Sequence, residues 1–181
     1  MPKAKFKMKN LLLLLAVSCL SFTVSAQKRD NLTDKEDLQV REAQELDLRM
    51  KVFVKIVDRR FLALTDPNAA QNKQVQKDID DWGDLRVGTS QEIYWDIQKT
   101  INEAILKLDD AAERDQKNPL FGKAVHILAD ACQKWLAPLK PALGRTSDEK
   151  EKGLILASID YCNQVLEASA KVPKEEKKKK N

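Results

Sequence analysis

Apolar residues recur at every third or fourth position through most of this chain of 181 residues. That spacing places them on one face of an α-helix and predicts amphipathic helices. In the first stretch the apolar face consists of Ala43, Leu46, Met50, Phe53, Val57, Phe61 and Leu64. We predict four long helices over residues 34–65, 90–113, 119–136 and 147–171. A short connecting helix is predicted over residues 67–82.

Local signals mark the ends of these helices. Thr followed three residues later by Glu can form a capping box, in which each side chain bonds the other residue's backbone N–H. This pattern occurs at Thr33–Glu36, Thr89–Glu92 and Thr146–Glu149. A polar residue before proline predicts two further starts, at Asp66-Pro67 and Asn118-Pro119. Helix stops are predicted at Gly83, Pro138 and Pro173.

Each predicted helix has an apolar face that needs a partner. At 1.5 Å per residue the long helices are about 27–48 Å in length, and short connections such as residues 115–117 favour antiparallel neighbours. The sequence therefore predicts an all-α fold spanning residues 27–172. Its architecture is an antiparallel up-down helical bundle of four long helices with one short connecting helix.

The first 26 residues have the pattern of a signal peptide. Four lysines precede the apolar run 11–17, and small residues follow at 24–26. We predict cleavage between Ala26 and Gln27, export to the periplasm or the medium, and no transmembrane span after cleavage. The alternatives are lipid attachment at Cys19 and an uncleaved anchor, which would be short with about 16 mainly apolar residues against the ~20 of a span.

Charge is distributed unevenly along the chain. Without the four lysines of the signal peptide, 28 basic and 28 acidic residues remain. The net charge of residues 27–170 is −4, and that of residues 171–181 is +4. A nucleic-acid-binding domain would concentrate positive charge on its folded part, so we predict no nucleic-acid partner. Residues 173–181 form a disordered Lys-rich tail in this interpretation. Lys177–Lys180 could make weak electrostatic contact with an anionic surface.

Catalytic motifs are not found in the sequence. Nucleophilic catalysis by Ser or Cys needs an aligned base and an oxyanion hole, and neither a nucleophile elbow nor a glycine-rich loop occurs. We predict that the protein is not an enzyme and has no catalytic, cofactor-binding or metal residues. The alternative is haem b held by Met50, the one methionine outside the signal segment, and His126, the one histidine.

The spacing of the candidate ligands disfavours two metal sites. The run 78–84 resembles a calcium loop, but position 5 is Trp82 and the acid required at position 12 is Thr89. Zinc held by His126, Cys132 and Cys162 is disfavoured because the first two are about 600° apart along a helix, which turns them about 120° from each other.

The two cysteines outside the signal segment, Cys132 and Cys162, lie on apolar faces of successive predicted helices. With those helices ending near 139 and starting near 147, the cysteines are about 10 and 22 Å from the turn. That mismatch exceeds the Cα separation a disulfide tolerates, about 4.4–6.8 Å. A later helix start at Gly153 would remove most of it. Buried free thiols are the preferred interpretation, and a disulfide remains the alternative.

Five aromatic residues could include a stacking platform for sugars, although aromatics at helical spacing usually belong to the core or its rim: Trp82, Trp95, Trp135, Tyr94 and Tyr161. Tyr94 and Trp95 are adjacent, so only one of them can point into a helical core and the other should face outward. The sequence thus predicts an exported, non-enzymatic helical-bundle protein of the envelope or medium, acting as an interaction or structural module with an unknown protein partner. The alternative is a bundle that binds a small ligand or haem b.

Overall fold

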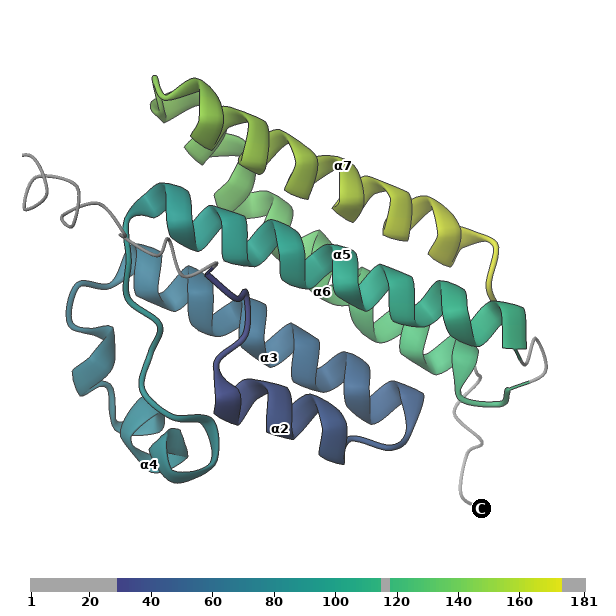
Figure 1. Cartoon of the computed structure of the whole chain (residues 1–181). Coiled ribbons are helices and arrows are strands. Elements are labelled where there is room, and N and C mark those ends of the chain that lie inside the picture. Colours follow the sequence, from purple (N-terminus) through teal and green to yellow (C-terminus); the bar gives the residue numbers. More distant parts are fainter. Residues whose placement is uncertain (1–28, 115–117, 174–181) are drawn as a thin grey trace, which may run out of the picture.

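The computed structural model describes residues 29–114 and 118–173, and these form an all-helical fold. Figure 1 shows long helices packed side by side, with shorter helices along the lower edge of the view. The predicted all-α class is confirmed, since no strand occurs in the described part of the chain. The signal peptide and the tail beyond Pro173 lie outside the described residues, so their predictions stand untested.

The first predicted helix is two helices, which corrects the continuous helix over 34–65. They are α2 (Asp34–Glu42) and α3 (Leu46–Thr65). Ala43 leaves the helical conformation with ψ at 83°, and its carbonyl accepts a bond from Arg49 Nε at 3.0 Å. The break lets α2 fold back along α3 (Figure 1). It brings the buried Glu36 against Arg60, a pairing that a straight helix would forbid.

The short connecting helix is also divided. A 3-10 turn, η1 (Ala69–Gln71), precedes α4 (Lys73–Trp82), whose N-cap is Asn72. The predicted start at Asp66-Pro67 is wrong because the Asp66 carboxylate accepts from the Asn68 amide at 2.8 Å, which forms a turn. The predicted stop at Gly83 is confirmed, since Gly83 has φ of +68°.

Helix α5 (Ser90–Arg114) follows the prediction closely, with the capping box at Thr89–Glu92 in place. Helix α6 (Phe121–Arg145) does not, because it continues through Pro138 and beyond the predicted end. A proline removes the bond to the carbonyl four residues earlier, and here that residue, Lys134, is exposed to water. Continuation buries Leu139 completely, which offsets the lost bond.

Helix α7 (Glu149–Ala170) begins two residues later than predicted. Its N-cap is Asp148, whose carboxylate accepts from the Glu151 amide at 2.9 Å. The predicted cap, Thr146, accepts from the Asp148 amide at 3.2 Å and shapes the turn instead. The connection between α6 and α7 is therefore very short.

The four long helices have a definite arrangement in cross-section. Helices α3 and α7 lie on opposite sides, and α5 and α6 lie between them, each packed against both (Figure 1). At one end of the molecule the carboxyl ends of α3 and α6 meet the amino ends of α5 and α7. Consequently α3 runs parallel to α6, and α5 runs parallel to α7.

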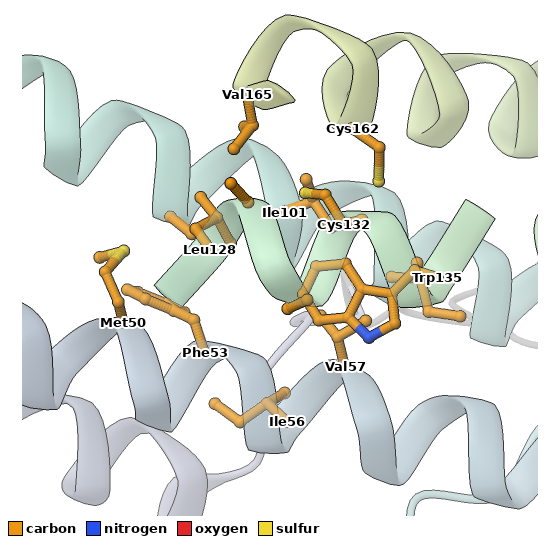
Figure 2. Close-up of a cluster of buried hydrophobic side chains, with 14 of the residues drawn as sticks. Met50, Phe53, Ile56, Val57, Ile101, Leu128, Cys132, Trp135, Cys162 and Val165 are labelled. Atoms are coloured by element: carbon orange, nitrogen blue, oxygen red, sulfur yellow. The ribbon is translucent and has the colours of Figure 1, made fainter. Parts of the chain in front are cut away.

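These helices share one hydrophobic core. Figure 2 shows side chains from several helices filling it, including Met50, Phe53, Leu128 and Trp135. The predicted apolar faces are largely buried. Phe61 and Leu64 are half-buried at the margin of the core. A smaller cluster of Ala69, Val75 and Leu85 packs beneath Leu62 and fixes the region of α4.

Candidate functional site

The haem candidates have separate surroundings. His126 Nε2 donates to the Val172 carbonyl at 2.9 Å and so attaches the segment after α7 to α6. Met50 is fully buried in the core beside Phe53 (Figure 2). His126 thus holds the segment after α7, and Met50 fills part of the core.

The acidic run 78–84 is held by cations of the protein. The Asp78 carboxylate pairs with Lys55 at 2.6 Å, and the bond with Lys55 is the main reason that its pKa is lowered. Arg59 Nη2 donates to the carbonyls of Gly83 and Asp84 at 2.7 and 3.1 Å. Among the described residues no group of three or more His, Cys, Asp or Glu side chains is placed to hold a metal ion.

The adjacent aromatics divide as expected. Tyr94 is buried in the core and Trp95 is half-exposed, with Lys99 Nζ 6.0 Å from the centre of its ring. Trp135 belongs to the core, where its Nε1 donates to Asp58 at 2.7 Å. Trp82 is buried under the Lys55 ammonium, 4.3 Å from the ring centre.

A buried charge network joins α2, α3 and α5, and sequence reasoning missed it. Glu36, Arg60 and Asp96 are all fully buried. Arg60 Nη1 and Nη2 donate to the two carboxylate oxygens of Glu36 at 2.7 and 2.6 Å. Arg60 Nε lies 3.4 Å from Asp96 Oδ2. The sequence contains one indication of this network. Arg60 lies four positions after Ile56, and this spacing places it on the buried face of α3.

Asp96 is shared by three arginines. Arg29 donates to both its oxygens, at 3.1 and 2.7 Å, and Arg86 Nε lies 3.2 Å away. The hydrogen bond to Asp96 raises the pKa of Arg29, whereas burial lowers the pKa of Arg86. Because these residues come from three separate segments, the network fastens the chain before α2 and the loop before α5 onto α5.

A pocket of about 430 Å³ opens at the end of the molecule where four helix termini meet. Every long helix contributes to its wall. The lining includes Phe61 and Leu64 of α3, Ser90 and Tyr94 of α5, Pro138, Ala142 and Arg145 of α6, and Glu151 of α7. A volume of this size is typical of sites for small molecules or for a projecting group of a partner.

The polar side chains of this terminal pocket differ in the interactions that they make. Ser90 donates a hydrogen bond to the Glu151 carboxylate. Burial is the main cause of a raised pKa at Tyr94, followed by the charge of Glu151, while Arg145 acts in the opposite direction. Arg145 forms no ion pair with any residue in the described ranges. The pocket therefore combines an apolar wall with one basic and one acidic side chain, Arg145 and Glu151.

Comparisons with protein-family models, curated proteins and solved structures give no match to this chain. The fold and the terminal pocket define the class as an all-helical protein with a concave site at the helix ends. Across residues 29–114 and 118–173, no helix combines the length and the apolar character needed to cross a membrane.

Proposed function

We propose that this chain is an exported, non-enzymatic helical-bundle protein that acts as an interaction module of the envelope or the medium. In this proposal the terminal pocket receives a projecting group of a protein partner. The observation that carries it is the convergence in one pocket of an apolar wall and Arg145, which forms no ion pair within residues 29–114 and 118–173. Export is supported by the N-terminal pattern of lysines, apolar run and small residues.

The architecture that we propose is an up-down bundle within residues 27–172. Supporting it, successive long helices alternate in direction, since the pocket collects the carboxyl ends of α3 and α6 and the amino ends of α5 and α7. In such a fold short loops join antiparallel neighbouring helices, which brings several helix ends together at each end of the bundle.

The pocket's chemistry favours a partner group that is part apolar and part acidic. Phe61, Leu64 and Ala142 offer hydrophobic contact, and a carboxylate from the partner would meet Arg145. Glu151, which accepts from Ser90, is the acidic side chain of the same pocket, so the partner's carboxylate would have to lie on the Arg145 side. Guanidinium and carboxylate groups form the strongest of the ordinary side-chain pairs.

Site-specific crosslinking in cells that export the protein tests this proposal. A benzoylphenylalanine at Ser147, an exposed residue of the pocket rim, should give one discrete adduct, identified by mass spectrometry. The same residue at Lys140, exposed on α6 outside the pocket, is the control and should give no such adduct. Arg145→Glu should abolish the adduct while Lys140→Glu leaves it.

Equal adducts from both positions, or none from Ser147, would count against a partner at this pocket. A small molecule that co-purifies with the protein and is lost in Arg145→Glu would instead support the ligand-binding alternative. The intact mass of the exported protein tests separately whether the N-terminal segment is a cleaved signal peptide. A chain beginning at Gln27 is expected, and a chain that retains Met1 or carries lipid on Cys19 would contradict it.

A further inference from the structure

Cys132 of α6 and Cys162 of α7 lie level with each other in neighbouring helices. Cys132 precedes Arg145, the last residue of α6, by as many residues as Cys162 follows Glu149, the first residue of α7. At 1.5 Å per residue both are about 20 Å from the turn. The predicted difference between the two cysteines in distance from the turn is wrong. Helix α6 continues through Pro138 to Arg145, so the turn lies further from Cys132 than predicted.

The two thiols share one buried environment. Both side chains are fully buried, and both are free thiols in this structure. Figure 2 shows them reaching into the space between α6 and α7, Cys162 pointing from α7 toward α6. A hydrogen bond with Cys162 is the first cause, and burial the second, of the raised pKa of Cys132. With equal depth along two packed helices and both side chains buried between them, the two thiols lie in the same part of the core.

We propose that Cys132 and Cys162 are a disulfide site, closed by exchange with a disulfide donor in the compartment to which the chain is exported. The proposal rests on the export in the proposed function. The thiolate of one cysteine attacks the donor disulfide, which forms a mixed disulfide and releases one donor thiol. The second thiolate then attacks the protein sulfur and releases the other donor thiol. The chain loses two hydrogens as protons and two electrons reduce the donor.

Burial dictates when this exchange takes place. The reacting species is the thiolate, which an apolar core disfavours, and no donor can reach a fully buried sulfur. The bridge therefore forms on a chain whose α6 and α7 have not yet packed. Once packed, the same burial shields it from reductants. The link would hold together the two helices that supply Arg145 and Glu151 to the terminal pocket.

Refolding of the purified chain in a glutathione redox buffer tests the site directly. The full chain without its signal segment is unfolded, then refolded with oxidised and reduced glutathione. The expected product is lighter than the reduced protein by about 2 Da, since the exchange removes two hydrogens. Peptide mapping should join residues 132 and 162. The urea midpoint should rise, and a reductant added during unfolding should cancel the rise.

A Cys132→Ala/Cys162→Ala variant is the control and should show neither the mass change nor a redox-dependent midpoint. In the reduced native protein both thiols should resist a thiol reagent until urea unfolds the chain. Two titratable thiols after oxidative refolding, or glutathione adducts without a bridge, would overturn the site. A bridge that forms in the test tube but is missing from exported protein that begins at Gln27 would refute closure in that compartment, whereas a chain that retains Met1 would refute export.

Discussion

Removing the charge of the buried Glu36 tests how much its ion pair with Arg60 contributes to the free energy of unfolding. Glu36→Gln keeps the shape of the side chain and still permits a capping box with Thr33, whose amide bonds Glu36 Oε2 at 2.9 Å. The substitution removes the negative charge that faces Arg60, and it replaces one of the two acceptor oxygens by an NH2 group that cannot accept from Arg60. The guanidinium of Arg60, with no exposed surface, then keeps Asp96 as its one carboxylate partner, 3.4 Å away.

The expected cost follows from the burial of the pair. Breaking a buried ion pair by neutralising one member costs about 3–5 kcal/mol when the other charge loses its compensation in the core. Arg60 keeps Asp96, which it shares with Arg29 and Arg86, so the expected cost lies toward the lower end of that range. A surface pair is the matched control: Lys152 bonds Glu149 at 2.7 Å with both side chains partly or largely exposed. Glu149→Gln should cost no more than about 0.5 kcal/mol.

Urea unfolding monitored by circular dichroism measures both variants. A further variant, Glu36→Gln/Arg60→Met, removes both charges and should cost less than the sum of the single changes, since buried charges without partners are the source of the penalty. If Glu36→Gln costs less than about 1 kcal/mol, the pair is hydrated in solution and the argument from burial fails.

Three more measurements probe other parts of the molecule. Phe53→Ala, at a fully buried position, should cost about 3–5 kcal/mol in the same urea assay, and a loss below about 1 kcal/mol would place Phe53 outside the core. Added haem should produce no Soret band, and a band lost in Met50→Ala or His126→Ala would replace the proposed function. Deleting residues 174–181 should reduce co-sedimentation with anionic vesicles at low salt, where each lysine contributes about 1 kcal/mol; unchanged sedimentation would show that the tail has no role there.

Much of the fold was predictable because it depends on local signals. The three-and-four spacing placed Met50, Phe53 and Val57 in the core, and all are fully buried. The capping box at Thr33 and the glycine stop at Gly83 were also correct, since such signals act through bonds within one or two turns.

The break between α2 and α3 could not be predicted from those signals. No glycine or proline marks residues 43–45, and the apolar spacing continues across them. The gain that favours the break lies elsewhere in the chain: Glu36 reaches Arg60, and Arg60 contacts Asp96 of α5. Spacing along one segment carries no information about partners that far apart in the sequence.

The length of α6 depends on contacts with distant parts of the chain, and it determines the geometry of both proposed sites. Local rules favour a stop at Pro138, whereas burial of Leu139 and Ala142 against the core favours continuation, and the core contacts prevail. The added turns carry Arg145 into the terminal pocket, and they bring Cys132 level with Cys162. The pocket and the disulfide site thus share one structural cause but are tested by unrelated experiments. Loss of the Ser147 adduct would leave the refolding result untouched, and a failed refolding test would leave the pocket in place.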